Sequence, residues 1–332
     1  MASNSCIHGR GASTITAVHP NIIETHILTR LDGPSLASMA STSPLLHKLC
    51  NKEYLWEDLC KSTWNSIEHP LVRQTISSFS GGYRSFFSDS FPLLGPNSCQ
   101  VSYKDQVHTS ELISAVDIYY GNDHVHANVI ATKMDKRSSL GSLFCVELLD
   151  EEETAEMPIK YEGDENKCML DVEKNLRLSW IIIDPNLRRA GNVSSLRPVS
   201  VRPYWDGSGI KVKYATILSG MDTTEFVECR VVAMFGCEVG KNIELKELSL
   251  CVVDMYQTRL NGEKSLRILT DAMQRGKRKK ANGEEKEMYV KYMDLKRKKR
   301  DELKKDNMVY RVLWLTHGFW GQPPPSLSAA LW

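Results

Sequence analysis

The segment 18–64 places the strongest constraint on what this chain can fold into, because it holds several short helical patterns with clear breaks between them. Pro20 begins the first pattern, where its missing amide hydrogen costs nothing, and aliphatic residues then recur at helical spacing. A Gly-Pro pair at 33–34 and a Ser-Pro pair at 43–44 begin further helices. A module of about 45 residues cannot bury this much aliphatic surface alone, so a partner surface is expected.

The order of these residues resembles an F-box, the motif that docks a protein onto the Skp adaptor of a cullin–RING ubiquitin ligase. His19-Pro20 stands where that family has Leu-Pro, and Leu55-Trp56 followed by Leu59-Cys60 is similar to its terminal Leu-Trp and Leu-Cys pairs. The usual Val-Ser-Lys-x-Trp is absent, and residues 40–46 stand there with Leu in place of Trp. Over residues 15–305 the chain also resembles a group of plant F-box proteins of unassigned substrate.

The resemblance implies a non-catalytic substrate receptor, whose partners are the Skp adaptor, the cullin and RING subunits bound through it, and an unknown protein substrate. It implies that apolar side chains of the helical segment bind the adaptor, partly while filling their own small core. These residues are Pro20, Ile22, Ile23, Ile27, Leu28, Leu31, Leu36, Met39, Leu45, Leu49 and Trp56. The alternative is a self-contained helical subdomain packed on the rest of the chain.

The composition excludes several classes of protein. The 332 residues are 42% hydrophobic with a formal net charge of +1, which is enough for globular cores and gives no overall sign of a nucleic-acid or membrane surface. Nine cysteines without a Cys-x-x-Cys pair indicate a reduced intracellular protein and disfavour a zinc site. No signal peptide or membrane span is expected, and neither is a metal or cofactor. The expected location is the nucleus, the cytoplasm or both.

The predicted fold class is α+β and multidomain, with a small N-terminal helical F-box, then a mostly antiparallel β-sandwich or open barrel, then a basic C-terminal helix and tail. The boundaries are disordered residues 1–14, the F-box at 15–65, an aromatic-rich helical or loop bridge at 66–100, the β-rich substrate-recognition domain at 101–275, a basic helix at 276–308 and an apolar, proline-rich tail at 309–332.

Period-two patterns predict the strands of the β-rich domain at 112–118, 125–132, 143–149, 169–172, 176–184, 210–218, 226–235 and 248–256. Residues 147–165 are acidic and are expected to form a solvated loop. The aromatic residues of the bridge are expected to join the F-box rigidly to the next domain. They are Phe79, Tyr83, Phe86, Phe87 and Phe91.

Two basic clusters near the C-terminus resemble a bipartite nuclear-import signal. Their residues are Lys277, Arg278, Lys279, Lys280, Lys296, Arg297, Lys298, Lys299 and Arg300. A solvated charged helix with i, i+4 ion pairs explains the same pattern equally well.

No catalytic signature is found in the sequence. His124-x-His126 has the spacing of a metal pair but lacks a third ligand, so polar decoration of a strand is favoured. The residues 207–209, Gly-Ser-Gly, read as a hairpin turn, and Trp180 reads as core. Two other functions stay open: a lectin-like glycoprotein-binding F-box protein, and, as the weaker alternative, a nuclear nucleic-acid binder that uses 277–305 on phosphates.

Overall fold

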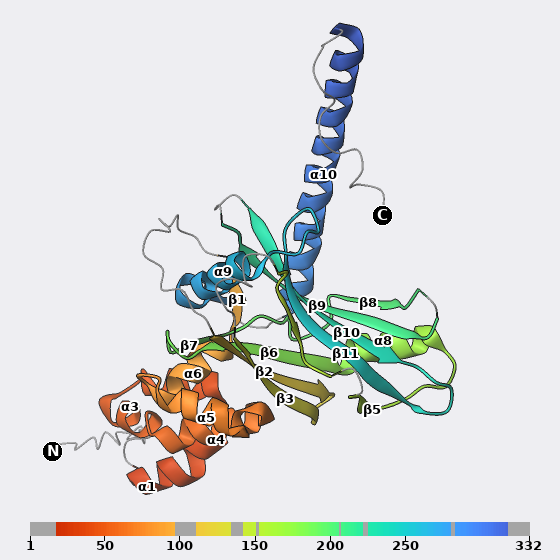
Figure 1. Cartoon of the computed structure of the whole chain (residues 1–332). Coiled ribbons are helices and arrows are strands. Elements are labelled where there is room, and N and C mark those ends of the chain that lie inside the picture. Colours follow the sequence, from red (N-terminus) through yellow and green to blue (C-terminus); the bar gives the residue numbers. More distant parts are fainter. Residues whose placement is uncertain are drawn as a thin grey trace, which may run out of the picture.

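The computed structural model describes residues 18–96, 111–133, 142–150, 153–205, 207–221, 225–279 and 283–317. In this part of the chain, N-terminal helices pack beneath one of two stacked β-sheets, and a long C-terminal helix leaves the body beside the other sheet (Figure 1). The N-terminal helical region, the mostly antiparallel open sheets and the C-terminal helix confirm the predicted α+β class.

The helical elements of the first part are α1 (Pro20–Ile22), η2 (Ile23–Ile27), η3 (Leu28–Arg30), α2 (Gly33–Ala40), α3 (Pro44–Cys50), α4 (Glu53–Thr63), η4 (Asn65–Glu68), α5 (Pro70–Ser77) and α6 (Gly82–Ser90). The predicted helix starts are confirmed by the side chains that cap them. Asp32 accepts a hydrogen bond from the Ser35 amide at 2.9 Å, and Ser43 accepts one from the Leu46 amide at 3.2 Å. Because each cap satisfies an otherwise unpaired amide, both helices begin at fixed residues.

The strands form two sheets that face each other. The first has the order β12-β1-β7-β6-β2-β3, and the second has the order β4-β11-β10-β9-β8, with β5 also paired to β11. Neighbouring strands run antiparallel except β1 and β7. The strands are β1 (Leu93–Gly95), β2 (Glu111–Tyr120), β3 (Asp123–Lys133), β4 (Cys145–Glu147), β5 (Ala155–Lys160), β6 (Leu176–Asp184), β7 (Arg189–Asn192), β8 (Ser200–Pro203), β9 (Gly209–Ser219), β10 (Phe226–Gly236), β11 (Asn242–Val253) and β12 (Lys277–Lys279).

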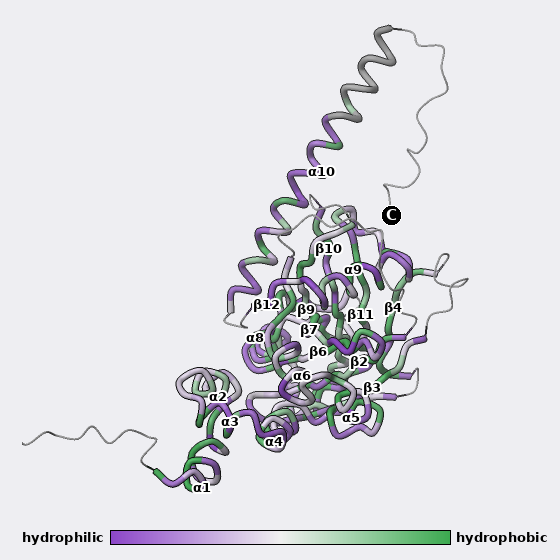
Figure 2. The backbone as a smooth tube through the Cα atoms, turned by 90° about the vertical axis from the view of Figure 1, so that its left-hand side faces the viewer, coloured by the Kyte–Doolittle hydropathy of each residue, from purple (hydrophilic) through white to green (hydrophobic). Residues whose placement is uncertain are grey.

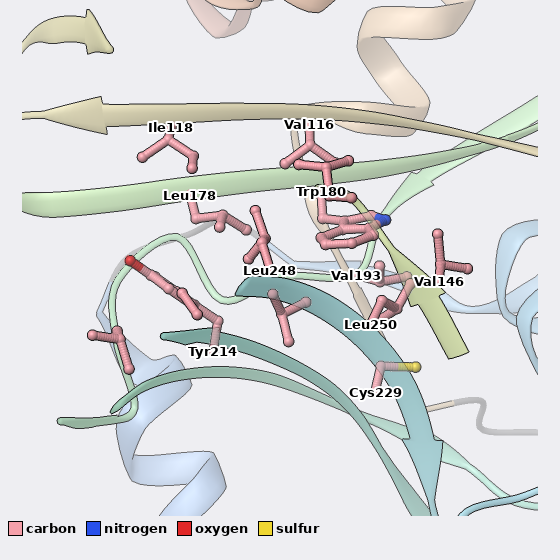
Figure 3. Packing of buried hydrophobic residues seen from close by; sticks show 14 of the residues in the cluster. Val116, Ile118, Val146, Leu178, Trp180, Val193, Tyr214, Cys229, Leu248 and Leu250 are labelled. Atoms are coloured by element: carbon pink, nitrogen blue, oxygen red, sulfur yellow. The ribbon is translucent and has the colours of Figure 1, made fainter. Parts of the chain in front are cut away.

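The main hydrophobic core lies between the two sheets (Figure 3). Val116 and Trp180 of the first sheet point toward Tyr214 and Leu250 of the second, and all four are fully buried. The Trp180 indole donates to Ser114 Oγ at 3.1 Å, which satisfies its buried N–H group. This burial confirms the prediction that Trp180 is core and not a ligand platform.

The opposite face of the first sheet carries the N-terminal helices. Alternate residues of β2 and β6, such as Ile113 and Ile181, belong to the same buried cluster as Trp64 and Phe86. Polar contacts fix this joint: Ser66 donates to Asp117 through both its amide (2.9 Å) and its hydroxyl (2.6 Å). These apolar and polar contacts join the N-terminal helices to the first sheet.

Several elements differ from the sequence prediction. Residues 169–172, expected as a strand, lie in helix α8 (Glu165–Asn175), because Asp164 caps it and Cys168 and Val172 are buried one turn apart. The expected acidic loop 147–165 contains strand β5, whose alternating burial places Met157 and Ile159 in the core. Helix α9 (Gly262–Arg275) lies at the end of the region predicted as β-rich, and the Asn261 side chain caps it.

The C-terminal basic region also differs from its predicted boundaries. Residues Lys277–Lys279 form strand β12, and helix α10 runs from Glu284 to His317, past the predicted end at 308. The base of α10 packs on the outer face of the second sheet, where Tyr289 and Tyr292 contact a cluster that includes Ile217. Beyond this base the helix projects away from the body (Figure 1).

Candidate functional site

Helices α1, α2 and α3 protrude from the rest of the molecule (Figure 2). Contacts with helices α4 and α6 help to hold them in place, such as the close approach of Gly33 to the Phe87 ring. Lys52 and Tyr54 both hydrogen-bond Glu24, and these hydrogen bonds lower the pKa of Glu24. Burial and the bond to Glu24 raise the pKa of Tyr54 to about 12, so its hydroxyl stays protonated as a donor.

The eleven residues implied as adaptor contacts divide into two groups by burial. Five of them are almost completely buried and form the inside of the module: Ile23, Leu28, Leu36, Leu49 and Trp56. The other six reach the surface: Pro20, Ile22, Ile27, Leu31, Met39 and Leu45. Only the second group can touch a partner directly, because a side chain without exposed area gains nothing more from being covered.

Trp56 shows what the buried group does. Its indole donates to the Cys50 carbonyl at 2.8 Å, and its ring lies 5.5 Å from that of Phe87 in α6. The Arg84 guanidinium lies over the Trp56 ring, 5.9 Å from the ring centroid. Trp56 therefore stabilises the junction of α3, α4 and α6 and would affect a partner only through the shape of the module.

A shallow, mainly apolar groove lies between α2 and α3 beside the surface group. Its lining residues are Pro34, Ser35, Ser38, Met39, Thr42 and Leu46. Sequence reasoning assigned only Met39 of these to the site. Pro34 was interpreted only as a helix start, although this half-buried residue also lines the groove from the first turn of α2.

The described cysteines do not offer a nucleophile. Cys60 is buried and donates to the Tyr83 carbonyl at 3.6 Å, and burial raises the pKa of its thiol. The same effect raises the pKa of Cys229. A thiol with a raised pKa stays protonated and unreactive near neutral pH.

The His124 and His126 pair lies beside a carboxylate, but no metal-binding cluster surrounds it. His124 Nε2 is 3.3 Å from Asp117 Oδ1, and burial lowers the pKa of His126. Within the residues that the structure describes, no three His, Cys, Asp or Glu side chains are grouped as metal ligands.

None of the described helices combines the length and apolar character of a membrane span.

Each of the two basic clusters contains one largely buried cation and others that are exposed or half-buried. Arg278 in β12 is largely buried and donates to the carbonyls of Asp89 (2.6 Å), Met273 (2.8 Å) and Ala190 (3.0 Å). Burial lowers the pKa of Arg278 to about 10. Lys296 is also buried, whereas Arg297, Lys298 and Arg300 are exposed and Lys299 is half-buried. Lys277 is exposed, Lys279 is half-buried, and Lys280 lies outside the described residues.

Three proteins of Arabidopsis thaliana are similar to this chain over most of its length. F-box protein At2g27310 is 35% identical over all of this chain and 98% of its own length. F-box protein At3g44326 is 37% identical, with 86% of this chain and 82% of the relative covered. Probable F-box protein At2g36090 is 37% identical, with 92% and 90% covered. No protein-family model matches the chain, and no solved structure gives a significant match.

Proposed function

The chain belongs to the plant F-box proteins, and on this premise we propose that it is the substrate-receptor subunit of a Skp–cullin–F-box ubiquitin ligase. Its protruding helices would bind a Skp-type adaptor, and its β-sheets would present a target protein. The observation that carries this proposal is the apolar surface left open on α1, α2 and α3 after the inside of the module is filled. Ile22 is 49% exposed, and Met39 lines an open groove.

This surface supports adaptor binding because a bound partner would bury apolar side chains that are otherwise exposed to water. Fully burying a Leu, Ile or Met side chain contributes about 1.5–3 kcal/mol, and six apolar residues between Pro20 and Leu45 reach the surface. The exposed residues are close together in sequence and belong to a rigid body. A groove of this kind suits a helix or loop of a partner with complementary apolar residues.

The receptor's contribution to ubiquitin transfer would be positional. Holding a target lysine near a charged conjugating enzyme raises its effective concentration, while other subunits carry out the chemistry. Such a role needs a rigid link between adaptor and target. The Ser66–Asp117 hydrogen bonds and the aromatic cluster around Phe87 supply that link between the helices and the first sheet.

Residence in the nucleus, the cytoplasm or both is a further part of the proposal. The exposed cations of α10, Arg297, Lys298 and Arg300, support an import signal better than β12, because Arg278 is occupied by backbone carbonyls. Imaging of a tagged chain with these three residues changed to Gln would test it: unchanged nuclear import would contradict the role.

The adaptor proposal is tested by measuring the affinity of a purified Skp adaptor for matched variants of the full chain. Ile27→Ser and Met39→Ser should each weaken binding by about tenfold, since each removes apolar contact worth at least about 1.4 kcal/mol. Leu170→Ser is the control, because Leu170 is 67% exposed on α8, away from the protruding helices. Equal affinities for the wild type and both surface variants would contradict the proposal.

In the same experiment, Trp56→Ala shows how a loss of folding differs from a loss of direct contact with the adaptor. Removing a buried indole costs about 3–5 kcal/mol, so this variant should lose adaptor binding together with helical structure. Circular dichroism would show that loss, whereas Ile27→Ser and Met39→Ser should keep the helical signal of the wild type. A weakened surface variant that had also lost helicity would not support a contact role.

A further inference from the structure

Two cysteines lie opposite each other at the edge of the second sheet. Cys145 belongs to β4, the edge strand, and its partner in the antiparallel ladder with β11 is Cys251. Both cysteines are free thiols in the structure. Their side chains point away from the main core, because the alternate residues Val146 and Leu250 fill it.

The hydrogen bonds of this ladder give the two cysteines the shortest cross-strand spacing. The Leu148 amide donates to the opposite Leu248 carbonyl at 2.8 Å, so these residues form a hydrogen-bonded pair. Opposite pairs in an antiparallel ladder alternate in type, which makes Cys145 and Cys251 a non-hydrogen-bonded pair. The Cα atoms of such a pair lie about 4.5 Å apart, within the range of about 4.4–6.8 Å that a disulfide spans. The two sulfurs can therefore be joined with little movement of the strands.

The two thiols differ in how easily a small oxidant reaches them. Cys145 is half-buried in the edge strand, whereas Cys251 is only 5% exposed. An oxidant from solution therefore meets Cys145 first. Cys251 lies beside it in the position of a resolving thiol, the second cysteine that converts an oxidised first one into a disulfide.

The surroundings of the pair determine how fast it can react. Burial raises the pKa of both thiols, and the neighbouring Cys251 raises that of Cys145 further. The positive charges of Arg230 and Arg259 oppose this rise at Cys251. Because the thiolate is the reacting form, neither cysteine suits a catalytic site, and the first oxidation step is slow near neutral pH. The second step is intramolecular, and the short spacing of the pair favours it.

We propose that Cys145 and Cys251 are an oxidation site, which hydrogen peroxide converts into a disulfide that fastens β4 to β11. The Cys145 thiolate attacks one peroxide oxygen and displaces hydroxide, which leaves a sulfenic acid on Cys145. The Cys251 sulfur then attacks the Cys145 sulfur and loses its proton, and the sulfenic oxygen leaves as water. Together the two thiols lose two electrons and two protons, and one peroxide becomes two waters. The site does not depend on the proposed receptor function.

Another thiol contact in the same sheet supplies the control. Cys168 of α8 and Cys237, which follows β10, form a hydrogen bond through their side chains. Because Cys168 lies in a helix, no strand ladder sets the separation of these two residues. Burial raises the pKa of Cys237 to about 12, so its thiolate is scarce at neutral pH. Cys168→Ser removes this contact and leaves the cross-strand pair intact.

The experiment treats the folded full chain with hydrogen peroxide, blocks the remaining thiols and maps linked peptides by mass spectrometry without reduction. The wild type and Cys168→Ser should both give a peptide pair joined through Cys145 and Cys251, and dithiothreitol should separate it. Cys145→Ser should not give this pair. Raising the pH by one unit should speed its formation about tenfold, because the thiolate fraction rises by that factor below the pKa.

The urea concentration at the midpoint of unfolding, compared between oxidised and reduced samples of each variant, measures the fastening of β4. Oxidation should raise this midpoint in the wild type and in Cys168→Ser, since a disulfide restricts the unfolded chain, and should not raise it in Cys145→Ser. A folded wild type without the Cys145–Cys251 link, or with a Cys168–Cys237 link in its place, overturns the assignment. A link that forms only in the urea-unfolded chain overturns it too, and a link that leaves the midpoint unchanged overturns the fastening.

Discussion

At the scale of single residues, similar apolar side chains in the protruding helices have different roles. Ile23 and Ile27 lie four residues apart in one helical segment, yet the first is completely buried and the second reaches the surface. The sequence spacing predicts that both belong to an apolar stripe. It does not predict which edge of that stripe is covered by α4 and α6, because that depends on contacts between elements.

His126 gives a residue-scale prediction about pH. Burial lowers its pKa below the ordinary 6.5, and its Nε2 has no hydrogen-bond partner among the described residues. Between the lowered pKa and 6.5, the unfolded chain therefore binds more protons than the folded chain, and stability rises with pH. The wild type should lose stability on acidification through this window, and His126→Gln should lose less.

Urea unfolding of both chains at pH 7.5 and pH 5 measures this difference. Each chain gives a change in the free energy of unfolding between the two pH values. Because every other titrating group is shared, the difference between these two changes isolates His126. Equal losses in the two chains would contradict the inferred burial of its neutral form.

At the scale of elements, Gly33 shows why α2 begins where it does. A Cβ atom at this position would lie 2.2 Å from two carbons of the Phe87 ring. That ring cannot move aside easily, since it stacks on Phe91 at 4.8 Å and contacts Trp56 and Trp64. The start of α2 therefore approaches α6 as closely as a glycine allows.

Gly33→Ala should consequently reduce the free energy of unfolding by about 1–3 kcal/mol, the usual cost of overpacking a core. Chemical denaturation of the full chain measures this change. Ser35→Ala on the exposed side of the same helix is the control and should change stability by less than about 0.5 kcal/mol. A Gly33→Ala chain as stable as the control would mean that α2 and α6 are not packed this closely.

Elements marked by local chemistry could be predicted from the sequence. Caps and prolines fix the starts of α2 and α3, and the alternation of Lys211 and Lys213 with aliphatic residues fixes the faces of β9. Other elements could not, because their structure depends on distant partners. Strand β12 is three basic residues that pair with β1, and carbonyls of Asp89, Ala190 and Met273 accept bonds from its Arg278.

The two candidate sites also differ in how far the sequence alone could locate them. The adaptor surface lies within about thirty consecutive residues, so a linear pattern could identify its segment but not its exposed side. The basic groove, between α10 and strands β8 and β9, combines Arg202 and Lys213 with Lys296 from α10, and no local spacing connects positions so far apart. From the sequence, the basic residues of α10 were interpreted as a solvated helix, an import signal or, as the weaker alternative, a nucleic-acid-binding segment.

At the scale of the whole molecule, the two sheets separate the candidate sites. The N-terminal helices cover the outer face of the first sheet, and α10 with the basic groove lies on the outer face of the second. A partner on one side would therefore leave the other side open. This arrangement suits a receptor that holds an adaptor and a target at a fixed separation.

On the proposed function, the apolar face of α1, α2 and α3 stays uncovered until an adaptor binds it. Hydrogen exchange of the full chain, with and without saturating Skp adaptor, measures this most directly. We expect new protection within residues 20–50 and unchanged exchange in strands β2 and β6. Protection confined to the sheets, or no change anywhere at saturating adaptor, would contradict it.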